Sequence, residues 1–157
     1  MRPLGHLAVS AGTGAVLWAL TDEPWAFVST VTAGVLVDAD HVVDYANWAL
    51  RQHPERVLYV FHGWEYLAPG VALGALLSWP PALVGALLGY ALHLIGDQFA
   101  NRAYPLSYSI VYRARHHFRM LEVSPWTPDA SLHDLRSSLP FAHRWVPALL
   151  RRLTGAD

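Results

Sequence analysis

Histidine and carboxylate side chains recur inside stretches of this sequence that are otherwise apolar. An ionisable group in an apolar environment costs several kcal/mol unless it is paired, so each one needs a partner or a function. These residues form four sets along the chain: His6; Asp38, Asp40, His41 and Asp44; His62 and Glu65; and His93 and Asp97. The sequence contains no cysteine, which excludes thiolate catalysis and any cysteine-based zinc site.

Imidazole and carboxylate donors without sulfur are typical ligands of Zn²⁺, Mn²⁺ or iron. The number of candidate ligands in the four sets exceeds what one divalent ion needs but suits two ions. Pairs of metal ions are common in phosphoester hydrolysis. The predicted metal ligands are His6, Asp38, Asp40, His41, His62, His93 and Asp97. Asp38 and Glu65 are also candidates for the catalytic base. The alternative is a network of ion pairs or a proton relay that holds no metal.

The spacing within each set predicts that its members lie together. His93 and Asp97 are four residues apart, and His62 and Glu65 are three apart, so each pair would share one face of a helix. Asp38 and His41 have the same three-residue spacing. Each set would therefore present its donors as a group.

The sets lie near the ends of four predicted apolar helices, at residues 4–20, 25–48, 57–79 and 81–99. The sequence is 54% hydrophobic and only 15% charged, against about 25% charged in typical soluble domains, and a helix of about 20 residues spans a bilayer. We predict an all-α fold, with a four-helix transmembrane bundle over residues 1–102 and a polar metal site at one face. Residues 103–157 would form a short helical C-terminal tail packing on the same domain. Within it, 140–153 would either lie at the membrane interface or form an ordinary surface helix that closes the bundle. The alternative is a compact soluble helical bundle.

Charged residues between the helices predict the orientation of the chain in the membrane. Asp22 and Glu23 follow the first helix, and Arg51 and Arg56 follow the second. The segment after the fourth helix carries Arg102, Arg113, Arg115 and Arg119. The positive-inside rule then places both termini in the cytoplasm. This orientation brings all four sets to the cytoplasmic end, although it was derived from the loops alone.

Two further features suggest contacts with partners. Gly70-x-x-x-Gly74 and Gly85-x-x-x-Gly89 would let the third and fourth helices approach closely, and such small-residue faces also allow a homo-oligomer. Arg113, Arg115 and His117 could bind a substrate phosphate, or form a basic stretch that meets anionic lipid. A net charge of −1 argues against a nucleic-acid partner.

The polar positions resemble those of the bacterial membrane-bound metal-dependent hydrolases, also described as LexA-binding, inner-membrane-associated hydrolases. The resemblance covers roughly residues 5–117 and rests on four motifs: Gly5-His6, Asp38-x-Asp40-His41, His62, and His93-x-x-x-Asp97 before Tyr104-Pro105-Leu106-Ser107. Three positions depart from the family pattern. Val37 stands where the family has Pro, Phe61-His62-Gly63 replaces Thr-His-Ser, and Glu65 is added.

The expected function is that of a metal-dependent hydrolase embedded in the bacterial inner membrane, acting on a phosphoester such as a lipid head group. A non-catalytic membrane scaffold or ion-handling protein would use the same cluster of histidines and carboxylates. A membrane di-iron oxidase is a third alternative, which the absence of paired His-x-x-His-His motifs disfavours.

Overall fold

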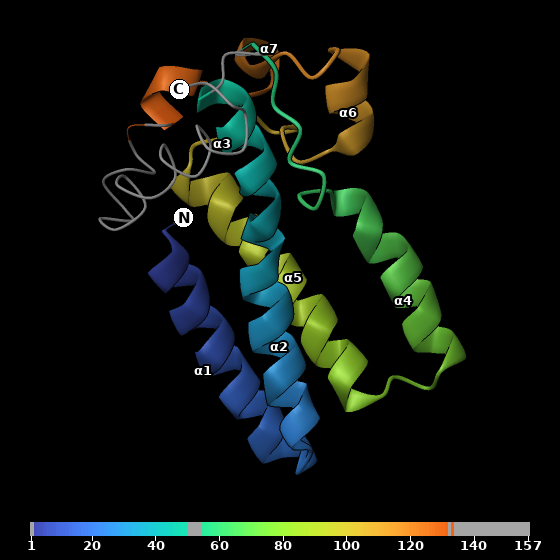
Figure 1. Ribbon diagram of the computed structural model, residues 1–157. Helices are drawn as coiled ribbons and strands as arrows, with labels where there is room; N and C mark the ends of the chain where they lie inside the picture. Colours follow the sequence, from blue (N-terminus) through green and yellow to red (C-terminus); the bar gives the residue numbers. More distant parts are fainter. Residues whose placement is uncertain (1, 50–54, 132, 134–157) are drawn as a thin grey trace, which may run out of the picture.

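The computed structural model describes residues 2–49, 55–131 and 133 (Figure 1). This part of the chain is helical and contains no strand, only an isolated bridge between Arg56 and Arg119. Its elements are α1 (Pro3–Thr21), α2 (Pro24–Leu36), the 3₁₀ turn η1 (Val37–Asp40), α3 (His41–Ala49), the 3₁₀ turn η2 (Trp64–Tyr66), α4 (Leu67–Leu76), α5 (Pro81–Ala100), α6 (Ile110–Arg115) and α7 (Met120–Val123). The all-α prediction is confirmed.

Within the described residues, three helices are long and apolar enough to cross a membrane: α1, the continuous segment Pro24–Trp48 through α2, η1 and α3, and α5. Large apolar side chains on these helices stay exposed, among them Leu4, Leu20, Trp25 and Phe99. Soluble monomers rarely expose so much apolar surface, whereas a surface that meets lipid requires it. The helices thus support membrane association.

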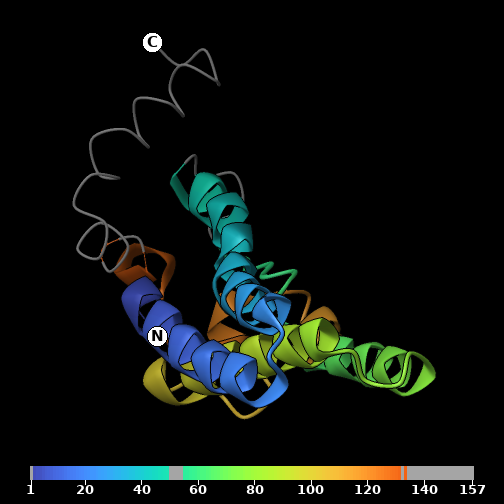
Figure 2. The ribbon, with the colours of Figure 1, turned by 90° about the horizontal axis from the view of Figure 1, so that it is seen from below.

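The third predicted span is shorter than expected. Of residues 57–79, only η2 and α4 are helical, and 13 helical residues reach about 20 Å, short of a hydrocarbon core of about 30 Å. Residues before η2 are held by partners elsewhere: Val57 N–H donates to the Phe118 carbonyl at 2.9 Å, and Leu58 N–H to Asp44 at 2.7 Å. The described residues therefore form three long helices and a short α4, which lies on the opposite side of the molecule from α1 in Figures 1 and 2.

Glycines bring α5 against α2. A Cβ added at Gly85 would lie 2.4 Å from the Ala26 carbonyl, and one at Gly89 would lie 2.1 Å from the Thr30 carbonyl, so neither position accepts a side chain. From the sequence, the glycine face of this helix was expected to contact the preceding helix, which carries Gly70 and Gly74. Gly70 does meet a side chain of α5, that of Leu87, but the close backbone approach is between α5 and α2.

The segments outside the long helices pack together at the end where α3 and α5 finish (Figure 1). Their core consists of Trp48, Val57, Met120 and Val123. The Met120 N–H donates to the Glu55 carbonyl at 2.8 Å, which ties α7 to the segment after α3. The helix predicted at 140–153 lies outside the described residues.

Candidate metal centre

Residues from all four polar sets meet at one end of the long helices. His6 comes from the first turns of α1, Asp38 and Asp40 from η1, His41 from the start of α3, and His93 and Asp97 from the last turns of α5. Helix α1 runs in the opposite direction to α2 and α5, so the start of α1 and the ends of the other two long segments share one end (Figure 1). Two overlapping groups have ligand atoms within 4.8 Å of one another: His6, Asp38, His93 and Asp97; and Asp38, His41, His62 and Asp97.

Two imidazole nitrogens form the centre of the cluster. Nε2 of His62 and Nε2 of His93 are 3.1 Å apart. Nδ1 of His93 lies 2.9 Å from the Gly34 carbonyl, which can only accept, so this Nδ1 carries the proton. Nδ1 of His62 lies 3.2 Å from the Asp40 carboxylate, an arrangement that likewise leaves Nε2 as a ligand atom. Two lone pairs that face each other at this distance require a cation or a proton.

The distances between donor atoms fit a tetrahedral ion. Asp38 Oδ1 is 3.5 Å from His62 Nε2 and 3.4 Å from His93 Nε2, and Asp97 Oδ2 is 3.5 Å from each of these nitrogens. Ligands bound tetrahedrally at about 2.1 Å are separated by about 3.4 Å. The five measured separations of 3.1–3.5 Å match this spacing, so the donor set suits a divalent ion.

The charge balance of the cluster also points to a cation. Burial lowers the pKa of His62, but the carboxylates of Asp38, Asp40 and Asp97 outweigh that effect and raise it to about 10. Without metal, this imidazole therefore holds a proton at neutral pH. A bound metal ion would displace the proton while leaving a positive charge among the carboxylates.

Asp40 and Asp44 position the segment that carries His62. Asp40 Oδ2 accepts a hydrogen bond from the Phe61 N–H at 2.6 Å, and the Asp44 carboxylate accepts from the N–H groups of Leu58 and Tyr59. The η1 turn, with three residues per turn, begins the segment in which these carboxylates lie. Asp40 thus supports the centre through His62 and lies outside the two groups above.

Arg113 is assigned a different task from the predicted one. Its side chain is fully buried, and its guanidinium donates to the carbonyls of Leu58, Tyr59 and His62. A buried guanidinium needs such acceptors, and these contacts occupy both terminal nitrogens. Arg113 therefore positions the segment that carries His62. The prediction that Arg113 binds a substrate phosphate is wrong, because its guanidinium is buried and already paired. Arg115 and His117 are exposed and remain predictions.

Glu65 also lies away from the cluster. His62 precedes the helical turn η2 and Glu65 lies within it, so the two do not share a helix face as predicted. Its carboxylate accepts hydrogen bonds from the Ser109 hydroxyl at 2.6 Å and from the N–H groups of Ile110 and Val111. Burial raises the pKa of Glu65, but these hydrogen bonds outweigh it and lower the pKa to about 2. Glu65 caps α6, which begins at Ile110.

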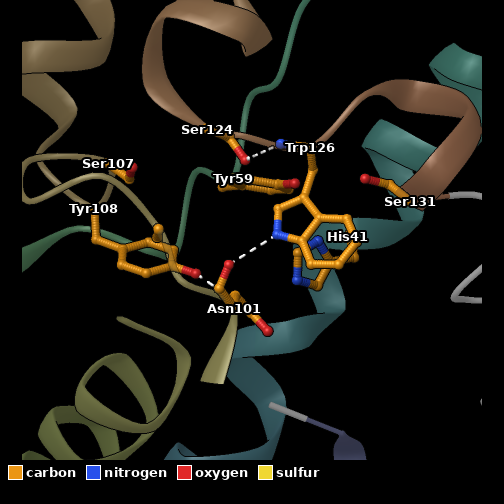
Figure 3. Close-up of a pocket in the computed structure, with 9 residues that line it drawn as sticks. His41, Tyr59, Asn101, Ser107, Tyr108, Ser124, Trp126 and Ser131 are labelled. Atoms are coloured by element: carbon orange, nitrogen blue, oxygen red, sulfur yellow. Dashed lines mark hydrogen bonds between the residues drawn. The ribbon is translucent and has the colours of Figure 1, made fainter. Parts of the chain in front are cut away.

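Access to the centre is through Asp38 and His41. Their side chains are 25% and 23% exposed, whereas those of Asp40 and Asp97 are 3% exposed. His41 lines a cavity of about 100 Å³ that sequence analysis missed (Figure 3). Its other walls include Tyr59, Asn101, Tyr108 and Trp126.

The polar cavity, as we call this space, is built from segments far apart in the sequence. The Trp126 indole donates to the Asn101 carbonyl at 2.8 Å, and the Asn101 amide donates to the Tyr108 hydroxyl at 3.3 Å (Figure 3). Tyr108 stacks on His62 with ring centroids 5.6 Å apart. Tyr104-Pro105-Leu106-Ser107 was the one signal in the sequence that pointed to this region.

Comparison of the chain with protein-family models, with curated proteins and with solved structures found no match. The assignment of a function therefore depends on the geometry of the centre and on the motif residues named above.

Proposed function

We propose that this protein is a membrane-embedded, metal-dependent hydrolase that acts on a phosphoester. One observation carries the proposal: two histidines and two aspartates, from α5, η1 and the segment before η2, converge with donor atoms 3.1–3.5 Å apart. The motifs that resemble the membrane-bound metal-dependent hydrolases supply these same residues. That resemblance also supports a location in the bacterial inner membrane, and the arginines in the loops support a centre at the cytoplasmic face.

The composition of the two ligand groups favours two ions. Each group contains Asp38 and Asp97, and each adds two histidines of its own: His6 and His93, or His41 and His62. His62, His93, Asp38 and Asp97 would hold one ion, and His6 and His41 are the further donors that a second ion would use together with the aspartates. When bound, the metal ions would polarise the phosphoryl group and make water a better nucleophile. Zn²⁺, Mn²⁺ and iron all suit these donors.

Asp38 is the residue placed to accept the proton of the attacking water. It is the most exposed carboxylate of the cluster, and its Oδ1 lies 3.3 Å from His41 Nε2. As the water oxygen bonds to phosphorus and the bond from phosphorus to the leaving group breaks, the water proton passes to Asp38. His41 lines the polar cavity and can relay that proton outward.

Neutral side chains surround the space next to the reacting group. Tyr59, Asn101, Tyr108 and Trp126 offer hydroxyl, amide and indole groups, and among the residues that the structure describes no arginine lines the polar cavity. The metal ions would then supply the positive charge that a phosphate requires, and the polar cavity would hold an uncharged, hydroxyl-bearing part of the substrate.

Elemental analysis of the purified protein, with single substitutions, tests the metal centre. We expect a bound divalent metal, and a substantial loss of it in His93→Ala and in Asp97→Asn, because each removes or weakens a donor. His133→Ala is the control, since His133 is exposed and lies outside both groups. Circular dichroism verifies that each variant is still helical. Equal metal content in all three variants would reject the centre.

Turnover of a soluble diester, bis(p-nitrophenyl) phosphate, and of phosphatidylglycerol tests the reaction. We expect the metal-loaded protein to hydrolyse a phosphoester, and Asp38→Asn to lose most of that activity, about 10²–10⁴-fold for a removed base. Stoichiometric metal without turnover of either compound would reject the hydrolase and favour an ion-handling or scaffold protein.

A further inference from the structure

An apolar groove lies beside the candidate metal centre. Its volume is about 380 Å³, within the range of about 300–1,000 Å³ typical of small-molecule sites. It is lined by Ala33, Leu36, Val37, Phe61, Tyr66 and Tyr90. The Tyr90 hydroxyl donates to the backbone of the segment 61–63, with the Phe61 carbonyl at 2.7 Å, so its polar group is already satisfied. We call this space the acyl groove.

The segment from α2 into α3 carries three environments in order. Leu36 and Val37 line the acyl groove, Asp38 belongs to the metal centre, and His41 lines the polar cavity. Over six residues of one continuous helical segment, the surroundings of the side chains thus change from apolar to charged and then to neutral polar.

Helix α5 repeats the same order along one face. Tyr90 lines the acyl groove, His93 and Asp97 belong to the centre, and Asn101, directly after the helix, lines the polar cavity. The spacings of three, four and four residues keep these side chains on one face. Two elements that pack against each other therefore present the same sequence of environments.

The position of the acyl groove determines what can fill it. Both α2 and α5 belong to segments able to cross a membrane, so with these segments inserted in a bilayer the acyl groove would open toward hydrocarbon chains. A helix from a second copy of this protein would cover the apolar walls but bring nothing to the charged centre. A membrane lipid has an apolar chain, a phosphoester and a polar head group in the order in which these environments occur.

We infer that the substrate is a membrane phospholipid that binds with an acyl chain in the acyl groove, its phosphate at the metal centre and its head group in the polar cavity. This inference rests on the proposed hydrolase function for the chemistry, but not for the binding of the lipid. Leu36, Phe61 and Tyr66 would hold the chain, and the length of chain they accommodate would contribute to substrate selection.

Photo-crosslinking tests the acyl groove without requiring any activity. Phosphatidylglycerol with a diazirine on its acyl chain is added at low ratio to the metal-loaded protein in detergent micelles, and labelled peptides are mapped by mass spectrometry. We expect labels to concentrate on residues 33–37, 61 and 66. Ala33→Trp, which fills the groove, should reduce this labelling several-fold. Labels spread evenly over exposed helix surfaces, or unaffected by Ala33→Trp, would overturn the inference.

A matched control separates blockage of the acyl groove from a general effect of the added ring. Ala8→Trp places the same bulk on an exposed position of α1, two residues from His6, and should leave the labelling unchanged. Metal content and helicity verify that each variant is folded. If Ala33→Trp fails to fold, Ala33→Leu replaces it, with a smaller reduction expected.

Turnover distinguishes failure of this inference from failure of the proposed function. With metal bound, Ala33→Trp should slow hydrolysis of phosphatidylglycerol several-fold more than that of bis(p-nitrophenyl) phosphate, which has no acyl chain. An equal loss on both compounds would overturn the role of the acyl groove. Labels confined to the groove without hydrolysis of either compound would support lipid binding and reject the hydrolase.

Discussion

The aspartates near the centre divide into two pairs by the atoms they contact. Asp38 and Asp97 face the Nε2 atoms of both central imidazoles. Asp40 and Asp44 accept hydrogen bonds from backbone N–H groups between Leu58 and Phe61, and Asp40 also contacts Nδ1 of His62. The second pair holds the segment that carries His62, and Arg113 holds the same segment through its carbonyls. Every one of these residues serves the centre, but only the first pair presents oxygens toward both central imidazoles.

Glu65→Gln tests the assignment of Glu65 as a cap of α6. We expect the variant to keep its metal content and to lose about 1 kcal/mol of stability at neutral pH, the typical cost of a weakened cap. The pKa of Glu65 falls from 4.5 to about 2 on folding, so its contribution to stability is complete above pH 4.5 and is lost as the pH falls through 2. Thermal unfolding in detergent measures the difference between wild type and variant.

That difference should be largest near pH 7 and shrink toward pH 2. Ser109→Ala removes one donor to the same carboxylate and should reproduce part of the effect. Loss of metal from Glu65→Gln would instead show that Glu65 belongs to the centre, as the sequence first suggested.

The helices differ in how well the sequence predicts them. Apolar runs that begin with a proline at the first helical position predict α1 and α5 to within a residue or two. Both signals can be read from neighbouring residues, since proline lacks the N–H that a helix start leaves unpaired and an apolar run favours a lipid environment. Residues 57–63 look equally apolar, yet their backbone is held by Asp44 and Arg113, which no local pattern encodes.

The centre was predictable to a similar degree. Alternating directions of the four predicted helices bring His6, His93 and Asp97 to the same end. These directions follow from the positions of the loops in the sequence. The polar cavity was missed because Tyr59, Asn101 and Trp126 meet through tertiary contacts alone.

Close packing of α5 on α2 leads to a prediction for Gly89. A Cβ at this position would lie 2.1 Å from the Thr30 carbonyl, so Gly89→Ala should force the helices apart and cost about 1–3 kcal/mol, typical of overpacking. The hydrogen bond between His93 and the Gly34 carbonyl spans the same contact, so metal affinity should also fall. Thermal unfolding and elemental analysis measure the two effects.

Gly12→Ala provides the matched control. Gly12 lies inside α1, and a Cβ there would meet nothing within 4 Å. Alanine is preferred to glycine in a helix by about 0.5–1 kcal/mol, so this variant should be slightly stabilised and keep its metal. Equal behaviour of the two variants would show that the α2–α5 contact does not position the centre.

At the scale of the whole molecule, the centre, the polar cavity and the small core around Trp48 share one end. The other end carries the acidic turn after α1 and the connection between α4 and α5 (Figure 1). The basic residues Arg102, Arg115 and Arg119 all lie in the segments that follow α5. By the positive-inside rule, this separation of charge predicts that the end with the centre faces the cytoplasm.

The absence of cysteine from the sequence allows a direct test of this orientation. Single-cysteine variants Asp22→Cys and Leu77→Cys, at one end, should react with a membrane-impermeant maleimide applied to intact cells. Arg115→Cys, exposed at the other end, should react only after the membrane is permeabilised, because basic segments are retained in the cytoplasm. The reverse pattern would invert the orientation and place the centre outside. Extraction of the protein without detergent would contradict membrane insertion itself, and with it the access of a lipid chain to the acyl groove.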